Sequence, residues 1–297
     1  MAIKKSSLSG LSFNRSISYV QPVASAGGGG GAVTVGPTAT GGTVTTFTDA
    51  NNATYKVHTF TSSGSFVVSS LGASNNSIEL LVVGAGSGGY LNTTGGAGGQ
   101  VKYYGAENAN LFTRDVAIAG SALATLEAAT YTVTIGAGQA AGTIGTAASS
   151  SFIGTGISVT STGGSNPQSG QTYRIYSISG NGFQTGTSGS NGYSHGGSGA
   201  AGRGSTYNSD IGGQGGNAQY FMIKGNTVTF VGGGGGFGIN EGYGANMERY
   251  RATGGQGAGR ADETGVANMG GGGGAGWNGS GAKAGGSGIV IVKYRIS

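Results

Sequence analysis

Short runs of β-branched and aromatic residues, bounded by Gly, Asn or Ser, recur through residues 43–179. Such runs are typical of β-strands, and the turn signals between them favour a sandwich or a barrel. Residues 121–129, Ser-Ala-Leu-Ala-Thr-Leu-Glu-Ala-Ala, are the one stretch that predicts a short helical turn. The predicted strands of this part are Thr43–Thr48, Tyr55–Thr61, Ser65–Ser69, Ile78–Val83, Tyr131–Ile135, Ser158–Thr160 and Thr172–Ser179.

Glycine-rich stretches dominate residues 180–288, where strands are predicted only at Ala218–Ile223 and Thr227–Val231. The chain then ends on the apolar strand Ile-Val-Ile-Val-Lys-Tyr-Arg-Ile at 289–296. Left exposed, such a strand is an aggregation hazard, so we expect it to return to a sheet begun earlier. The sequence therefore predicts an all-β, β-sandwich-like domain with long Gly-rich loops and a C-terminal strand that closes the sheet.

The N-terminal residues alternate small polar and apolar side chains, and this strand-like segment is too short to be stable alone. We expect it to attach to another protein through Leu8, Leu11, Phe13, Arg15, Ile17 and Tyr19; the alternative is a frayed tail. The predicted division of the chain is an attachment peptide at 1–26, a Gly-rich linker at 27–42, a strand-rich part at 43–179, a Gly-rich loop region of the same domain at 180–288 and the closing strand at 289–297.

Glycine supplies 69 of the 297 residues, and only eleven of these precede Gly84. Such a load indicates either disorder or backbone packed against backbone, because glycine buries little apolar surface and loses much entropy on folding. Disordered chains are rich in charge or proline, whereas this chain has 8% charged residues and three prolines. Its glycines show no period of three, which excludes collagen. The composition favours a compact, Gly-spaced β protein.

Several classes of chemistry are excluded or disfavoured by composition. The absence of cysteine excludes disulfides and thiolate ligands, and two histidines make a His-rich metal site improbable, so no cofactor is expected. The net charge of +5 comes from scattered residues, which does not favour nucleic-acid binding. No apolar stretch is long enough for a transmembrane helix, and serines interrupt the apolar pairs after the basic start, which disfavours a secretion signal. We therefore expect assembly in the cytoplasm of a host cell.

One motif resembles a nucleotide site. The predicted strand Ile78–Val83 leads into Gly84-Ala-Gly86-Ser-Gly-Gly89, the spacing of a dinucleotide-binding fingerprint. That fingerprint needs a helix next, and the Gly- and Thr-rich residues 90–99 do not favour one. A strand followed by glycines recurs at 227–238, and such repetition favours an architectural device over a nucleotide site.

Candidate catalytic groups are few. Asp262 with Glu263, or Glu241 with Glu248, supplies a carboxylate pair of the kind that cleaves glycosides, although nearby arginines provide simpler partners. His58 lies in a predicted strand and is expected to be structural, whereas His195 is expected to be exposed.

Aromatic residues interrupt the Gly-rich stretches and have two interpretations. They are either spacers between packed backbone segments or, at loop tips, groups that stack on a ligand such as a sugar ring. Under the second interpretation the candidate receptor-binding residues are Tyr193, His195, Tyr207, Tyr243, Tyr250, Arg251 and Trp277.

Three segments together resemble a known family. They are Thr59–Val68, Glu79–Gly86, and the glycine run 270–274 leading to Gly-Ser-Gly-Ile-Val-Ile-Val-Lys-Tyr at 286–294. In this order they resemble the glycine-rich domain of bacteriophage tail-fibre and other virion proteins, over about residues 55–297. The resemblance implies that some Gly-rich segments stack as polyglycine helices, and that an N-terminal segment attaches to the particle. The family shares no catalytic motif, so no active residue is implied.

The resulting expectation is a non-enzymatic virion protein, a tail fibre or adhesin that contacts a glycan or an outer-membrane protein of the host. The chain is expected to bind other virion proteins through residues 1–26 and to form a homo-oligomer, since fibres are commonly trimeric. The alternatives are a capsid decoration or fibre protein without a receptor, a polysaccharide depolymerase, and a cellular glycine-rich matrix protein.

Overall fold

The computed structural model describes residues 36–73, 75–90, 95–105, 124–166, 215, 218–225, 229–231, 263–275 and 281–297. The chain divides into two compact units, Met1–Val33 and Thr34–Ser297, and every described residue belongs to the second. The predicted attachment residues and the predicted strand Thr172–Ser179 therefore lie outside the described residues.

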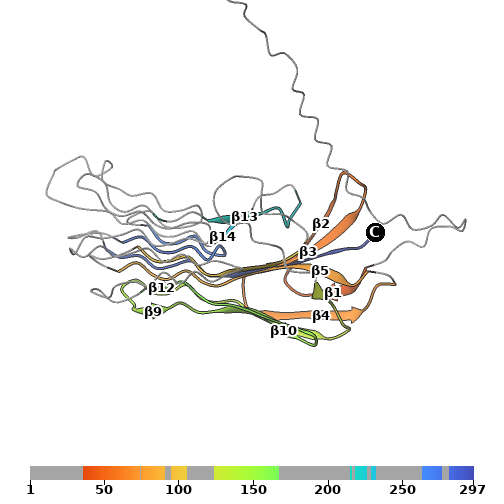
Figure 1. Cartoon of the computed structure of the whole chain (residues 1–297), viewed down its shortest axis with the longest axis horizontal. Coiled ribbons are helices and arrows are strands. Elements are labelled where there is room, and N and C mark those ends of the chain that lie inside the picture. Colours follow the sequence, from red (N-terminus) through yellow and green to blue (C-terminus); the bar gives the residue numbers. More distant parts are fainter. Residues whose placement is uncertain are drawn as a thin grey trace, which may run out of the picture. The chain divides into compact units, whose positions relative to one another are not determined.

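Two antiparallel sheets form the body of this unit (Figure 1). A six-stranded sheet has the order β2 (Thr43–Thr48), β3 (Thr54–Phe60), β15 (Ile289–Arg295), β5 (Ser77–Val83), β6 (Val101–Tyr104), with β7 (Ala124–Thr125) also paired to β5. A five-stranded sheet has the order β1 (Thr38–Thr40), β4 (Gly64–Ser70), β8 (Thr130–Thr134), β10 (Ser150–Gly154), β11 (Ile157–Ser161). Two further pairs join β9 (Gly145–Thr146) to β12 (Ser165–Asn166) and β13 (Gln219–Phe221) to β14 (Thr229–Val231). The prediction of an all-β, sandwich-like fold is confirmed.

The period-two alternation of these strands builds the core between the sheets. In β8, Tyr131 and Val133 are buried while the threonines on either side of them are exposed. Phe66 lies near the centre of this core, with the rings of Tyr131, Phe152 and Tyr294 within 6.4 Å of its centroid. Tilted and edge-to-face ring pairs of this kind add stability to that of the buried apolar area.

The central strands β5 and β15 of the six-stranded sheet are buried on both faces, whereas the edge strand β2 is largely exposed. Leu81, Val83, Ile289 and Ile291 point away from the five-stranded sheet, into a second apolar cluster that includes Phe221 of β13. This second layer explains why β5 and β15 are nearly continuous apolar runs rather than alternating ones.

The closing strand was predicted correctly. β15 lies between β3 and β5 and pairs with both, from Val290↔Phe60 to Arg295↔Tyr55 on one side and from Ile289↔Val83 to Lys293↔Glu79 on the other. The last strand of the chain thus joins two early strands that do not pair with each other.

The predicted helical turn at 121–129 is wrong over its described part. Ala124–Thr125 forms β7 and pairs with Ser77 and Ile78 of β5. Leu126 is buried in the core, and its N–H donates to the carbonyl of Asn76 at 2.8 Å. Tertiary pairing has overridden a weak local preference for helix.

Six strands of the described residues were not predicted, namely β1, β6, β7, β9, β10 and β12. β1 lies within the range that the sequence suggested as a linker, and its pairing with β4 makes residues 38–40 part of the five-stranded sheet. β6 and β10 also escaped prediction, because they are short and glycine or serine surrounds them.

Candidate functional site: the glycine stack and its outer end

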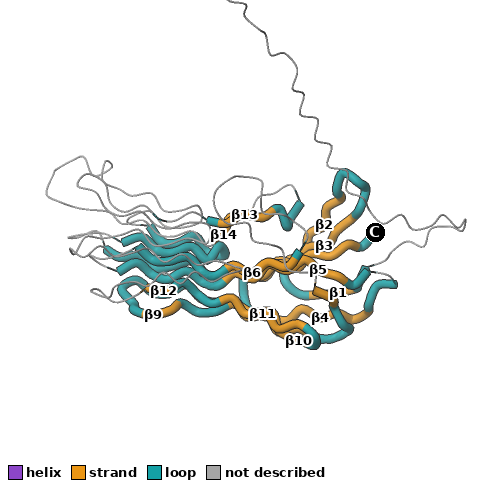
Figure 2. The backbone as a smooth tube through the Cα atoms, in the orientation of Figure 1, coloured by secondary structure: helices purple, strands orange, loops and turns teal. Residues whose placement is uncertain are grey.

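The strands continue into glycine-rich segments that leave the sheets together. Residues 84–89 follow β5, 136–142 follow β8 and 162–164 follow β11, while 95–100 lead into β6 and 281–288 lead into β15. In Figure 2 these segments are the teal runs that lie side by side beyond the orange strands.

Hydrogen bonds along 84–89 repeat every three residues. The N–H groups of Gly84 and Ser87 donate to carbonyls of 95–100, at 2.8 and 2.9 Å. Those of Gly86 and Gly89 donate to carbonyls of 281–288, both at 2.8 Å, and their own carbonyls accept from 136–142. A three-residue repeat without internal hydrogen bonds is that of a polyproline II helix, which explains why the partners lie in several directions around the segment.

Residues 84–89 are buried at the centre of this arrangement. Their backbone also bonds to Ala148, Gly164 and Gly273, at 2.7–3.1 Å. We call the whole arrangement the glycine stack; its described segments are 84–89, 95–100, 136–142, 147–148, 162–164, 263–275 and 281–288. The polyglycine-type packing that the family resemblance implied is present in these residues.

The glycines are required because backbone lies directly against backbone. A Cβ atom placed on Gly84, Gly86 or Gly89 would overlap the carbonyl oxygen of Thr162, Gly271 or Gly274, respectively. Sheets with side chains between them pack about 10 Å apart. Removing the side chains lets neighbouring segments share hydrogen bonds in three dimensions and brings Cα–H groups against carbonyl oxygens.

This geometry identifies the apparent nucleotide fingerprint as part of the scaffold. Each of its three glycines faces a backbone carbonyl of the same chain, which leaves no space for a pyrophosphate. Residues 95–100, on the far side of the undescribed 91–94, are another segment of the stack and not a helix. The second copy of the motif, at 232–238, lies outside the described residues.

A chain of backbone bonds joins five described residues of the stack, several residues away from β5, β8 and β15. Gly142 donates to Gly89, Gly89 to Lys283, Lys283 to Gly274 and Gly274 to Glu263, at 2.8–2.9 Å. We call this level the outer end of the stack. Among the described residues that stand directly next to undescribed ones are Tyr90, Asn166, Glu263, Ala275 and Gly281.

All of the candidate receptor-binding residues lie outside the described residues, so their prediction is untested. They are Tyr193, His195, Tyr207, Tyr243, Tyr250, Arg251 and Trp277. Of the candidate acids, Glu241, Glu248 and Asp262 also lie outside, whereas Glu263 is an exposed residue of the outer end.

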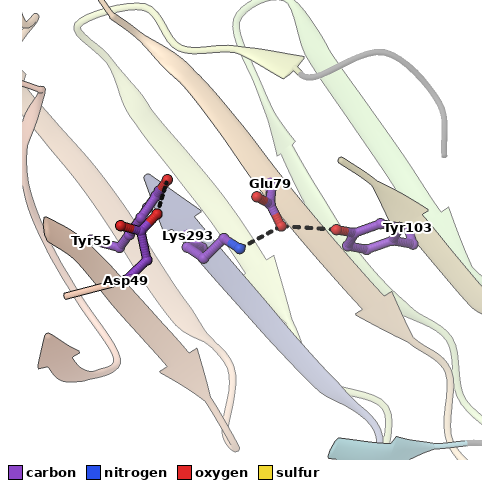
Figure 3. A network of polar contacts seen from close by, with 5 residues as sticks. All are labelled: Asp49, Tyr55, Glu79, Tyr103 and Lys293. Carbon is purple, nitrogen blue, oxygen red and sulfur yellow. Dashed lines mark hydrogen bonds and ion pairs between the residues drawn. The ribbon is translucent and has the colours of Figure 1, made fainter. Parts of the chain in front are cut away.

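A polar network crosses the outer face of the six-stranded sheet (Figure 3). The Lys293 ammonium lies 2.8 Å from a carboxylate oxygen of Glu79, and the side chains are 7% and 14% exposed. The same carboxylate oxygen accepts a hydrogen bond of 2.8 Å from the Tyr103 hydroxyl. Lys293 also lies 5.4 Å from the ring centroid of Tyr55 and 6.0 Å from that of Phe47.

Sequence reasoning did not single out this network, although its signal is present. Glu79 and Lys293 are an acidic and a basic residue within two largely apolar strands. Opposite charges in strands that are buried on both faces are expected to pair, since an unpaired buried charge is costly. The ion pair joins two residues that lie opposite each other in the pairing of β15 with β5.

At the other end of the network, Asp49 organises the β2–β3 hairpin. One carboxylate oxygen accepts the N–H groups of Asn51 and Ala53 at 2.9 Å, and the other accepts the Tyr55 hydroxyl at 3.4 Å. Asn52 has a φ of 60°, a turn conformation that asparagine tolerates. Burial is the main cause that raises the pKa of Tyr55, and the negative charge of Asp49 is the next cause.

His58 is a buried structural residue of β3. Its Nδ1 lies 2.7 Å from the Gly41 carbonyl and its Nε2 lies 3.0 Å from the Tyr294 hydroxyl. Burial lowers the pKa of His58, and burial raises the pKa of Tyr294 to about 12.

A shallow, hydroxyl-lined depression of 190 Å³ lies over the turn between β3 and β4, around Thr59–Ser65. Typical small-molecule sites are larger, about 300–1,000 Å³, and contain convergent polar groups in an apolar cleft. Among the described residues, no group of three acidic, His or Cys side chains is placed to hold a metal ion, and no helix could cross a membrane.

The fold defines a class of protein in which a β-sandwich continues into a stack of glycine helices. The sequence comparison agrees with this class, because the model of a glycine-rich domain family matches residues 60–295. The chain belongs to this glycine-rich domain family. No curated protein and no solved structure gives a significant match.

Proposed function

We propose that the protein is a bacteriophage virion structural protein, a tail fibre or adhesin that contacts the host surface through loops carried on the glycine stack. The observation that carries this proposal is the outer end of the stack, where backbone bonds tie together Gly89, Gly142, Glu263, Gly274 and Lys283. A binding surface needs loops on a rigid support, and loops are where binding residues concentrate.

The stack is suited to this role because its geometry is fixed by backbone hydrogen bonds. Buried segments such as 84–89 cannot slide, because each glycine faces a specific carbonyl of its neighbour. Loop sequences can then change without a matching change in a side-chain core. Such a scaffold supports an adhesin that must follow variation in its receptor.

In this proposal residues 1–26 attach the protein to other virion proteins, and homo-oligomerisation strengthens the attachment. The protein is made in the host cytoplasm and then resides in the virion. It acts by binding a surface glycan or an outer-membrane protein, without catalysis. The test of attachment is deletion of residues 2–26, which should abolish incorporation into particles while the remaining domain stays folded.

The test of receptor binding is a combined Tyr193→Ala, Tyr207→Ala and Trp277→Ala variant, measured for binding of the purified protein to host cells. We expect at least about a thirtyfold loss of affinity, which is the effect of losing a single aromatic hot-spot residue worth about 2 kcal/mol or more. Leu71→Ala is the matched control, since Leu71 is an exposed apolar residue of the sandwich with 46% of its surface accessible. It should bind as the wild type does.

Two other outcomes would replace this proposal. A protein that joins particles but does not bind host cells is a decoration or capsid-fibre protein. A protein that degrades host polysaccharide, and loses this activity when Glu241, Glu248, Asp262 and Glu263 become alanine, is a depolymerase. Unfolding curves in urea for each variant separate these outcomes from simple loss of the fold.

A further inference from the structure

His58 joins three parts of the sandwich at the point where the described domain begins. It belongs to β3 and is fully buried, with its ring against Phe66 of β4 and Tyr294 of β15. Its Nδ1 lies 2.7 Å from the carbonyl of Gly41, directly after β1. Tyr294 in turn has a backbone hydrogen bond with Ala39 in β1. One imidazole and one phenol therefore add side-chain contacts to the pairing of β1 with β4 in holding residues 39–41 onto the sheets.

The partners define which ring nitrogen carries the proton. A backbone carbonyl only accepts, so Nδ1 donates to Gly41 and the neutral ring has a free lone pair at Nε2. That lone pair accepts the hydroxyl of Tyr294 at 3.0 Å. Both ring nitrogens are satisfied while His58 is neutral.

A second proton on the ring breaks this arrangement. Protonated Nε2 becomes a donor, so the Tyr294 hydroxyl oxygen must accept from it while the hydroxyl hydrogen rotates away and loses its acceptor. The new positive charge is buried, and burial without a partner is costly. The charged group that acts on His58 is Lys56, another cation on the same strand, while Tyr294 on β15 is neutral and Phe66 on β4 and Gly41 after β1 carry no charge.

We propose that His58 is a pH-sensitive clasp, which holds residues 38–42 on the sandwich while its ring is neutral and releases them when the ring takes up a proton. The clasp controls the attachment of the segment through which residues 1–35 join the domain. This inference does not depend on the proposed host-binding function.

Hydrogen exchange of the full-length protein tests the clasp. Corrected for the intrinsic effect of pH, exchange of the amides in residues 38–42 should rise about tenfold or more as the pH falls from about 8 to about 5. His58→Gln, whose amide can still donate to Gly41 and accept from Tyr294, should lose this dependence. The chain has a second histidine, so His195→Gln is the matched control and should keep the wild-type response.

Three results would overturn the clasp. One is a wild-type protein whose residues 38–42 stay equally protected throughout this pH range. Another is a His58→Gln variant that loosens in acid as the wild type does. If His58→Gln does not fold, the third test uses the wild-type protein. The pH midpoint of the exchange transition must then coincide with the titration of the His58 ring protons in NMR spectra. A different midpoint refutes the proposal.

Discussion

At the scale of single residues, Gly86 shows what the glycine stack demands. A Cβ atom there would overlap the carbonyl of Gly271, whereas a Cβ atom at Gly64 in β4 meets nothing within 4 Å. Gly86→Ala should therefore lower the free energy of unfolding by about 1–3 kcal/mol or more, the usual cost of overpacking. Gly64→Ala should be neutral or slightly stabilising, because it only reduces the entropy of the unfolded chain. Urea denaturation of both variants checks this, and equal stability would contradict the backbone-to-backbone account.

The ion pair between Lys293 and Glu79 is the second residue-scale case. Removing one partner leaves a charge that is largely buried, so Lys293→Met should destabilise by about 3 kcal/mol. The double variant Lys293→Met with Glu79→Gln should recover much of this loss, since the new amide can still accept from Tyr103. A double-mutant cycle measures the coupling. Additive effects would mean that the two side chains are not coupled.

At the scale of elements, β15 is the strand on which both apolar clusters depend. Ile291 in β15 is fully buried, whereas Ile153 in β10 is 43% exposed on an outer face. Ile291→Ala should cost about 2–5 kcal/mol through lost contacts and a residual cavity. Ile153→Ala should cost about 0.5 kcal/mol or less. Thermal and urea unfolding of the two variants compares the same substitution in two strands, and similar losses would argue against a central place for β15.

Strands were predictable from sequence where side chains carry the signal. β2 was found with its observed bounds, Thr43–Thr48, and β15 followed from its apolar run. β7 was mistaken for a helical turn because its two residues are strand only through pairing with β5. The stack could not be derived from pattern, because its contacts join backbone atoms and the choice of partner leaves no mark on side chains. The glycine load indicated that backbone packs against backbone, but only the family resemblance indicated stacked polyglycine helices.

The candidate functional site, like the glycine stack, was only partly predictable from the sequence. The aromatic residues of the Gly-rich stretches, such as Trp277, are visible in the sequence, but nothing in it indicates which of them converge. The network around Lys293 was detectable as opposite charges in two largely apolar strands, yet naming Tyr103 and Tyr55 as its other members required the register of the sheet.

At the scale of the whole described domain, two packing modes share the same segments. The segment from Ser77 to Gly89 begins as a strand whose side chains fill two apolar clusters and ends as a helix of the stack. The first half is stabilised by buried apolar area and the second by backbone hydrogen bonds. The change occurs at Val83–Gly84, where the last large side chain gives way to the first glycine of the motif.

The free energy of unfolding of the whole domain should depend on pH in two ranges, an acid edge and an alkaline edge of its pH profile. The pKa of His58 is lowered in the folded state, so the unfolded chain binds more protons and stability should fall as the pH drops below about 6.5. The pKa of Tyr294 is raised to about 12, so the folded state keeps its proton longer and stability should fall as the pH rises from about 10 towards that value. Between these two edges the contribution of His58 and Tyr294 to the free energy of unfolding does not change with pH.

The two edges can be separated because each belongs mainly to one ring. Tyr294→Phe should flatten the alkaline edge without removing it, since the pKa of Tyr55 is also raised. His58→Gln should flatten the acid edge and leave the alkaline one in place. Urea midpoints measured across this pH range test both expectations. An alkaline edge that Tyr294→Phe leaves unchanged would mean that the phenol is not confined by the core, and the link from β15 through Tyr294 to β1 would then have to be abandoned.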